Sequence, residues 1–237
     1  MNQRTNGNAR MLRKLGVLPT GLVELSVATI SDSLQKLGLR SQILEPAIRP
    51  IVPFTKMAGT AVTVKLAAAS KPSSYSRLIG QAFEAGLSVP LPVLVVEYPP
   101  DLLGAAVIGS GGAHVMQEHF GFGGCVVNGA IRDTDDLQRM KFPAFARFVH
   151  PEYVFGLLEG VSVNQPVVVG GVEIRPGDIV VGDNDGVAAI PQNRLAEVIQ
   201  AAEEILRSEQ MILREIDEGR PYLEVLRELQ PEAFQES

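Results

Sequence analysis

The segment GCVVNGAIRD, residues 124–133, joins a run of small and apolar residues to a charged loop. Residues 125–127 form a short continuous apolar stretch, which is typical of a strand covered on both faces. Residues 128–130 then lead to an arginine and an aspartate side by side, Arg132 and Asp133. The segment therefore predicts a buried strand that ends in a charged pair.

The residues before this strand predict alternating strands and helices. Strands are expected at residues 59–64, 93–96 and 105–108, the first from its β-branched alternation and the others from their continuous apolar character. Helices are expected from a capping box at residues 29–32 to Gly38, along the apolar side formed by Leu78, Ile79, Ala82 and Phe83 to Gly86, and over residues 113–120 before Gly121.

The residues beyond Pro151 predict a β-rich module instead of another strand–helix repeat. Short apolar runs are separated by turn sequences rich in glycine, proline and aspartate; these runs lie at residues 167–169, 172–174, 179–181 and 187–190. Asn193 is expected to cap a long helix that ends near Glu218, before Gly219. We therefore expect one α/β domain with a β-rich second half and a long C-terminal helix.

Three segments are expected along the chain. They are an N-terminal arm at residues 1–19, an α/β core domain at residues 20–191, and a C-terminal helical segment at residues 192–237. The last segment is expected to pack on the core or on a neighbouring subunit.

The composition argues against several classes of function. The 237 residues carry a formal net charge of −6 and include no tryptophan, so neither the basic face nor the stacking platform of a nucleic-acid-binding protein is expected. Cys125 is the single cysteine, which excludes an internal disulfide framework. No run approaches the roughly 18 apolar residues of a membrane span, and the first residues lack the apolar core of a signal peptide. We expect no membrane partner and a cytoplasmic location.

A cluster of glycines, Gly109 to Gly112, lies between a predicted strand and a predicted helix. Glycine lets the backbone approach a ligand closely, and the first turn of a helix presents unpaired N–H groups to a carboxylate or phosphate. The alternative is a tight turn without a ligand. The cluster lacks the GxGxxG spacing and the Walker lysine of nucleotide-binding loops.

The Arg132–Asp133 pair has two interpretations. Arginine suits a carboxylate or a developing enolate oxygen, because it keeps its charge and offers several donors. One or two carboxylates with water ligands suit Mg²⁺ or Mn²⁺, and Asp135 and Asp136 follow closely. The alternative is a surface ion pair, with Asp135 or Asp136 as the N-cap of a helix.

Glu209 interrupts an apolar stripe on the predicted C-terminal helix, three residues from both Leu206 and Ile212. A carboxylate in such a stripe is costly unless it is paired or reaches another subunit. Glu209 is therefore either a residue at the rim of the packed face or an acid or base of a site. His114, which follows the glycine cluster, is a further candidate for proton transfer.

Several separated motifs, at residues 30–38, 59–64, 124–133, 142–147 and 175–191, occur together in one chain. With these motifs the chain resembles the family of the regulator of ribonuclease activity A and the 4-hydroxy-4-methyl-2-oxoglutarate aldolases. The resemblance covers most of the chain. It implies a swivelling β/β/α-type fold and a homotrimer or homohexamer with active sites between subunits.

The resemblance also implies roles for individual residues. Backbone amides of the loop from Ser110 through Gly111 and Gly112 to Ala113 would bind a substrate carboxylate. Arg132 would contact the substrate and Asp133 would hold Mg²⁺ or Mn²⁺, while Glu209 would enter the site of a neighbouring subunit. The aldolases often carry an acidic residue at the position of Gly111, and His114 would partly replace it.

These features predict a divalent-metal-dependent, class II-type lyase that cleaves a carbon–carbon bond of a small 2-oxo acid to give pyruvate. The expected activity is that of a 4-hydroxy-4-methyl-2-oxoglutarate aldolase, an oxaloacetate decarboxylase, or both. The alternative is a non-catalytic regulator that binds a protein partner, as the ribonuclease regulator does. The presence of Arg132, Asp133 and Asp136 favours the enzyme, and glycine at position 111 favours the regulator. A related lyase or hydrolase acting on another oxo acid is a third possibility.

Overall fold

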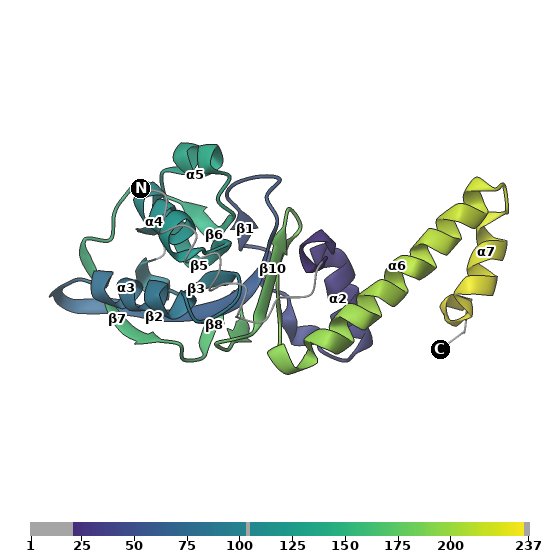
Figure 1. The fold of residues 1–237 in the computed structure, drawn as a ribbon, viewed down its shortest axis with the longest axis horizontal. Coiled ribbons are helices and arrows are strands. Elements are labelled where there is room, and N and C mark those ends of the chain that lie inside the picture. Colours follow the sequence, from purple (N-terminus) through teal and green to yellow (C-terminus); the bar gives the residue numbers. More distant parts are fainter. Residues whose placement is uncertain (1–20, 103–104, 235–237) are drawn as a thin grey trace, which may run out of the picture.

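The computed structural model describes residues 21–102 and 105–234, and a nine-stranded sheet forms its centre (Figure 1). The strands lie in the order β1-β6-β5-β3-β2-β10-β11, with β4 paired to β5 and β7 paired to β2. The pairs from β2 through β3 and β5 to β6 are parallel, as is the pair of β4 with β5. The strands β10 and β11 continue the sheet in antiparallel fashion, and β8 and β9 form a separate hairpin.

The bounds of the strands are β1 (Arg49–Pro50), β2 (Met57–Ser73), β3 (Pro92–Glu97), β4 (Ala106–Ile108), β5 (Gly124–Ile131), β6 (Ala144–Val149), β7 (Gly156–Val163), β8 (Val167–Val169), β9 (Val172–Ile174), β10 (Ile179–Asp183) and β11 (Gly186–Ile190). The α-helices are α2 (Val27–Lys36), α3 (Ser76–Gly86), α4 (Ser110–Phe120), α5 (Thr134–Met140), α6 (Leu195–Asp217) and α7 (Tyr222–Leu229). Short 3₁₀ turns are η1 (Leu22–Glu24), η2 (Arg40–Gln42), η3 (Pro100–Leu102), η4 (Gln192–Arg194) and η5 (Pro231–Phe234).

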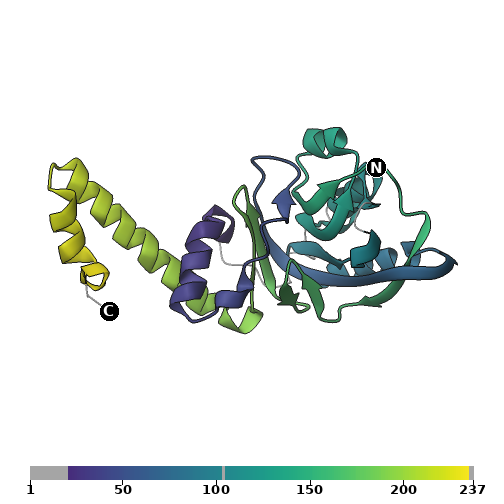
Figure 2. The same cartoon turned by 180° about the vertical axis from the view of Figure 1, so that it is seen from behind.

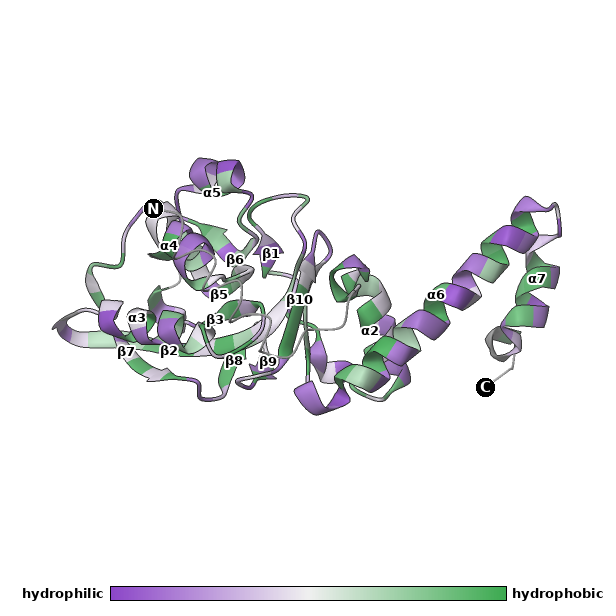
Figure 3. Cartoon of the chain, viewed as in Figure 1, coloured by the Kyte–Doolittle hydropathy of each residue, from purple (hydrophilic) through white to green (hydrophobic). Residues whose placement is uncertain are grey.

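The helices lie in two groups at opposite ends of the molecule. Helices α3, α4 and α5 lie near the parallel part of the sheet, whereas α2 and the start of α6 lie beyond β10 (Figure 1). The rest of α6 extends away from the sheet, and α7 folds back beside it (Figure 2). Figure 3 shows hydrophobic residues concentrated on the strands and on α2, while α6 alternates between hydrophobic and hydrophilic residues along its length.

The strand β3 shows why the centre of the sheet is apolar throughout. Side chains alternate between the two faces of a strand, and Leu94 belongs to the core between the sheet and helices α3 and α4. Its neighbour Val93 belongs to a second core on the opposite face, which includes the β8–β9 hairpin. A third core, with Ile30 of α2 and Val198 of α6, packs these two helices on β10 and β11. Both faces of the parallel strands are therefore covered, as the apolar runs predicted.

The predicted fold class is confirmed: the chain forms a mixed α/β domain with a β-rich second half and a long C-terminal helix. The predicted strands overlap β2, β3, β4, β5 and β8 to β11. The predicted arm at residues 1–19 lies outside the described residues, and the division of the chain into three segments stays a prediction.

The predicted start of the first helix was wrong. Helix α2 begins at Val27, because the Oγ of Ser26 accepts a hydrogen bond from the backbone N–H of Thr29 at 3.0 Å and caps the first turn. The capping box expected at residues 29–32 therefore lies inside the helix.

Two other helix starts also differ from the prediction. Helix α4 begins at Ser110, since the extended residue Gly109 precedes its first turn, and the glycines at 111 and 112 are helical. Helix α6 begins at Leu195, because Asn193 lies within the preceding 3₁₀ turn and does not cap the helix.

The pairing of β2 with β7 was not predicted. Strand β2 continues beyond residue 64 through a lysine- and alanine-containing stretch to Ser73, where it pairs with β7. Lysine, alanine and proline are depleted in strands, so pairing with β7, and not intrinsic propensity, determines that this stretch is a strand.

The helices within residues 21–102 and 105–234 all lack the combination of length and apolar character that crossing a membrane requires.

Candidate functional site

A pocket of about 350 Å³ opens where β4 and β5 end and α4 begins. Because β4 and β5 are parallel, their carboxyl ends meet at the same edge of the sheet, which is where open α/β sheets bind ligands. The residue after β4 and the first turn of α4 supply glycines to the pocket, and the loop after β5 supplies the charged pair. This polar end of the pocket is formed by Gly109, Gly111, Gly112, Arg132 and Asp133.

The backbone of Asp133 turns its side chain toward α4. Asp133 has φ 60° and ψ 40°, in the left-handed region that aspartate tolerates better than most residues. It is also the N-cap residue of α5, and its carbonyl oxygen accepts hydrogen bonds from the N–H groups of Asp136 and Leu137. The alternative in which Asp135 or Asp136 caps this helix is therefore wrong.

The Asp133 carboxylate is held from across the pocket. Its Oδ2 accepts a hydrogen bond from the backbone N–H of Ser110 at 2.9 Å and from the Ser110 Oγ at 3.1 Å. The first turn of α4 therefore binds one carboxylate oxygen with two donors, a favourable arrangement for negative charge at a helix N-terminus.

Gly109 is required by the close approach of this carboxylate. A Cβ atom at position 109 would lie 2.5 Å from Asp133 Oδ2 and 3.1 Å from Arg132 Cγ. The φ angle of Gly109 is −136°, which any residue adopts, so contact and not backbone conformation restricts the position.

Two of the four predicted substrate-binding amides have partners within the chain. The Ser110 N–H donates to Asp133, and the N–H of the buried Ala113 donates to the carbonyl oxygen of Gly109 at 3.0 Å. Gly111 and Gly112 stand in the first turn, where amides have no partner within the helix, and neither donates to another of the described residues. These two amides are the ones available to an anion in the pocket.

Arg132 is fixed by its backbone and by an aromatic ring. Its N–H donates to the carbonyl oxygen of Ile108 at 3.0 Å, which ties the end of β5 to the end of β4. Its guanidinium carbon lies 4.8 Å from the centre of the Tyr153 ring, within the range of a cation–π interaction. Tyr153 itself is brought beside β4 by a bridge to Ala106.

The chemistry of Asp133 fits a hard divalent cation that keeps most of its water. Oδ2 is engaged by Ser110, whereas Oδ1 accepts no hydrogen bond from the described residues, and the residue is exposed. Mg²⁺ is commonly bound through one or two carboxylates, with water and substrate oxygens completing the shell. Across residues 21–102 and 105–234, no group of three or more His, Cys, Asp or Glu side chains is placed to hold a metal ion. A water-rich Mg²⁺ or Mn²⁺ site therefore fits, and a structural zinc centre does not.

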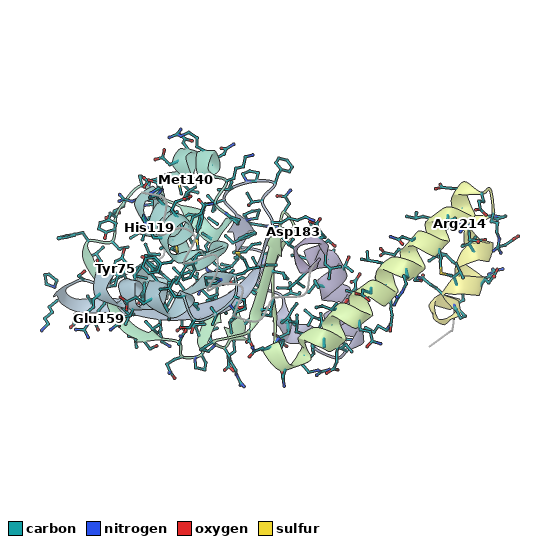
Figure 4. The ribbon with its side chains drawn as sticks, viewed as in Figure 1. Tyr75, His119, Met140, Glu159, Asp183 and Arg214 are labelled. Carbon is teal, nitrogen blue, oxygen red and sulfur yellow. The ribbon has the colours of Figure 1, made fainter. Side chains whose placement is uncertain are left out.

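The remaining predicted residues lie outside this pocket. The exposed His114 packs edge-on against His119 with 6.0 Å between ring centres. Asp136 pairs with Arg139 on α5 and lines a separate depression of about 380 Å³ on the other side of the charged pair. Glu209 is exposed on α6, which supplies no residue to the pocket of its own chain. Figure 4 marks the separation, with Tyr75 beside α3 and Arg214 near the far end of α6.

The sequence alone did not reveal the aromatic part of the pocket. Tyr75 and Tyr153 line it, and their hydroxyl groups lie 3.5 Å apart although the residues are 78 positions apart in sequence. Ile79 and Phe83 were predicted on one side of a helix, and this side faces the same pocket. The apolar pattern was the only available signal, and it does not distinguish a core from a pocket wall.

Comparison with known proteins gives one family. A family model described as RraA-like, Aldolase/RraA, matches residues 27–189. A protein of Halalkalibacterium halodurans, provisionally named 4-hydroxy-4-methyl-2-oxoglutarate aldolase, is 32% identical over 204 residues, which is 82% of this chain and 88% of the relative.

Two solved structures have folds similar to that of this chain. An uncharacterized protein from Pseudomonas syringae pv. tomato DC3000 matches with a TM-score of 0.74 and 26% identity, over 89% of this chain and 94% of that one. Streptomyces coelicolor RraAS2, described as an unusual member of the RNase ES inhibitor RraA protein family, matches with a TM-score of 0.70 and 26% identity, over 81% and 93% of the two chains. These structures share the mixed α/β architecture of this chain and agree with the fold that the family resemblance implies.

Proposed function

Because this chain belongs to the RraA-like family described as Aldolase/RraA, we propose that it is a divalent-metal-dependent lyase that cleaves a small 2-oxo acid and releases pyruvate. The observation that carries the proposal is the convergence of Arg132, Asp133 and two free amides of α4 on one pocket. The provisional name of the Halalkalibacterium halodurans relative supports an aldolase activity.

The pocket offers a partner for each oxygen-bearing group of a 2-oxo acid. The amides of Gly111 and Gly112 suit the carboxylate, since they lie at a helix N-terminus and have no partner in the chain. Arg132 suits the 2-oxo oxygen, on which negative charge develops when the bond beyond C3 breaks. The ring of Tyr153 keeps the guanidinium in place, so little reorganisation is needed as this charge forms.

The metal would be held by Asp133 together with water. Mg²⁺ or Mn²⁺ bound there supplies Lewis-acid polarisation of the 2-oxo group. Ser110 orients the carboxylate for this task through its two hydrogen bonds to Oδ2.

The retro-aldol reaction also needs a base. The C4 hydroxyl loses its proton and becomes a carbonyl, the C3–C4 bond breaks, and C3 takes up a proton to give pyruvate. We assign the base to Glu209 of a neighbouring subunit in a homotrimer or homohexamer, acting through water, since α6 leaves its own core and exposes this carboxylate. Oxaloacetate would lose CO₂ at the same charged pair without needing this base.

A regulator that binds a protein partner is the second candidate. The description of Streptomyces coelicolor RraAS2 as belonging to an RNase ES inhibitor family favours it, as does glycine at position 111. A surface that only binds a protein partner does not require a carboxylate oriented into a pocket. The left-handed backbone of Asp133 and its hydrogen bond from Ser110 orient the Asp133 carboxylate in this way. The construction of the Asp133 site therefore favours the enzyme.

The proposal is tested by coupling pyruvate release to lactate dehydrogenase. Oxaloacetate and 4-hydroxy-4-methyl-2-oxoglutarate are each supplied with Mg²⁺ or Mn²⁺, and then with EDTA. We expect enzyme-dependent pyruvate from at least one compound, with loss of the signal in EDTA and recovery when the metal is restored. Folded protein that releases no pyruvate above the metal-only rate from either compound, or from a 4-hydroxy-2-oxo acid with an uncharged substituent at C4, would contradict the proposal.

A further inference from the structure

One wall of the pocket is apolar and comes mainly from α3. Tyr75, Ile79 and Phe83 line it, and their exposed fractions are only 7%, 8% and 7%. Tyr153 and Val107 continue the same lining. These residues present carbon-rich surface to any group that extends from the charged pair into the pocket.

The Tyr75 hydroxyl of this wall is engaged with the protein. The Tyr75 hydroxyl donates to the carbonyl oxygen of Val107 at 3.1 Å, and its oxygen lies 3.5 Å from that of Tyr153. Burial raises the pKa of Tyr75 well above its usual range, so this hydroxyl stays neutral. The wall therefore offers the ring of Tyr75 and the side chains of Ile79 and Phe83 to a ligand.

Gly80 leaves open space in the same wall. It lies inside α3 and lines the pocket, and a Cβ atom at this position would meet no atom within 4 Å. Glycine in a helix interior is less favourable than alanine, because it loses more conformational freedom on folding. The first atom of a larger side chain at position 80 would meet no neighbouring protein atom, and the side chain would occupy space in the pocket.

The charged residues that line the pocket restrict the charge of the substrate group that lies beyond C3. Among the described residues that line the pocket, Arg132 is the only cation and Asp133 the only anion. Once Arg132 serves the 2-oxo acid end, the lining that this subunit supplies has no second cation for another carboxylate. A carboxylate against Ile79 and Phe83 would lose hydration and gain no cationic partner from this wall, which is costly.

We propose that the substrate carries an uncharged, apolar group beyond C3, and that Tyr75, Ile79, Gly80 and Phe83 select it. This inference rests on the proposed lyase function and names its substrate class. The substrate is then a 4-hydroxy-2-oxo acid with an aliphatic or aromatic substituent at C4. Cleavage of its C3–C4 bond, with transfer of the hydroxyl proton to a base and protonation of C3, gives pyruvate and an uncharged aldehyde or ketone.

The first arm of the test compares substrates for the whole protein with Mg²⁺. The probes are 4-hydroxy-2-oxo-4-phenylbutanoate, the dicarboxylate 4-hydroxy-4-methyl-2-oxoglutarate, and oxaloacetate as a compound with no apolar group. We expect kcat/KM for the phenyl compound to exceed that for the dicarboxylate by about tenfold or more, the scale on which apolar pockets discriminate. A higher kcat/KM for the dicarboxylate would overturn this inference and leave the lyase proposal standing. No pyruvate from any of the three would overturn the lyase proposal itself.

The second arm fills the pocket. Gly80→Leu should lower kcat/KM for the phenyl compound by about tenfold or more and affect oxaloacetate much less, because only the phenyl group reaches the wall. Gln81→Leu places the same side chain on the exposed side of the same helix and should change neither value. Urea unfolding confirms that both variants fold. An equal loss for the phenyl compound and oxaloacetate in Gly80→Leu would overturn the assignment of this wall to the substituent.

Discussion

At the scale of single residues, the site depends on how Asp133 is held. Its backbone is left-handed, its carbonyl oxygen starts α5, and one carboxylate oxygen is bound by Ser110. Each of these interactions restricts the Asp133 side chain. The second oxygen, Oδ1, is therefore held in place without a contact from another acidic residue. Gly109 makes the arrangement possible, because it leaves space for the carboxylate.

Replacing Gly109 by alanine should weaken metal binding. The new Cβ would lie 2.5 Å from Asp133 Oδ2, so the carboxylate must move away from Ser110. We expect Mn²⁺ affinity, followed by electron paramagnetic resonance, to fall by roughly 10–100-fold, the scale for losing a group that orients a metal ligand. Gly111→Ala is the matched control, because a Cβ there meets no atom within 4 Å. Equal Mn²⁺ affinity in wild type and Gly109→Ala would show that Asp133 does not bind the metal as proposed.

Cys125 should be chemically silent in the folded protein. The thiol is fully buried in β5, and burial raises its pKa to about 12. A free thiol ionises near pH 8.5, so the unfolded state gains an ionised form that the folded state lacks. The contribution of this thiol to stability is therefore complete below about pH 8.5 and is lost progressively as the pH rises toward about 12.

A thiol-reactive dye tests this prediction at pH 8. We expect no labelling of the native chain and stoichiometric labelling in denaturant. Rapid labelling of native protein would mean that the β5 strand opens to solvent and that the thiol is accessible.

At the scale of elements, the end of β5 is positioned by Tyr98, which follows β3. The ring of Tyr98 covers Gly129 in β5, where a Cβ atom would lie 2.7 Å from Tyr98 Cγ. The Tyr98 hydroxyl donates to the carbonyl oxygen of Ala105 at 2.6 Å, and burial raises its pKa. This contact fixes the start of β4 relative to the strand that delivers Arg132.

Gly129→Ala should therefore destabilise the fold. Overpacking of this kind typically costs about 1–3 kcal/mol, which a urea unfolding midpoint detects. Gly123→Ala, at the entrance to the same strand, is the control because a Cβ there meets no atom within 4 Å. If both variants have the same urea unfolding midpoint, the Tyr98 ring moves aside without lowering the stability of the fold.

The sequence predicted the strands of the sheet centre well, because their apolar runs report burial on both faces. It also predicted the charged pair and the glycine cluster, since both follow directly from strand ends. It did not predict the contact between Tyr75 and Tyr153, which depends on the parallel pairing of β4 and β5 and on the path of the chain beyond His150. Nor did it predict the long β2–β7 pair. This pair forms through tertiary contacts although the residues of β2 beyond position 64 have low strand propensity.

At the scale of the whole molecule, the C-terminal helices leave the core. Helix α6 packs on α2 along its first half, and α7 folds back beside its far end (Figures 1 and 2). Large apolar side chains stay exposed on these helices, with exposed fractions of 53% for Met211, 60% for Leu213 and 57% for Leu223. Exposed apolar surface on an extended helix is typical of an oligomer contact, which is consistent with the proposal that Glu209 serves another subunit.

Mixing two inactive variants tests whether the site is shared between subunits. Arg132→Ala should lose both retro-aldol and decarboxylase activity, whereas Glu209→Gln should lose mainly the retro-aldol activity. If the two residues come from different subunits, co-refolding equal amounts should restore about one quarter of the retro-aldol sites by random assembly. A mixture that stays as inactive as its components, with hybrid oligomers confirmed by mass, would place both residues in one chain or remove Glu209 from the reaction.

The central claim, that Asp133 supports metal-dependent cleavage in this pocket, is tested most directly by comparing two aspartate variants. Pyruvate release is followed with the better of the two metals for wild type, Asp133→Ala and Asp135→Ala. Asp135 is also exposed and lies outside the pocket lining, so it controls for the loss of one surface charge. We predict that Asp133→Ala abolishes enzyme-dependent pyruvate while Asp135→Ala retains it. Full activity in Asp133→Ala, or equal losses in both variants, would contradict the claim.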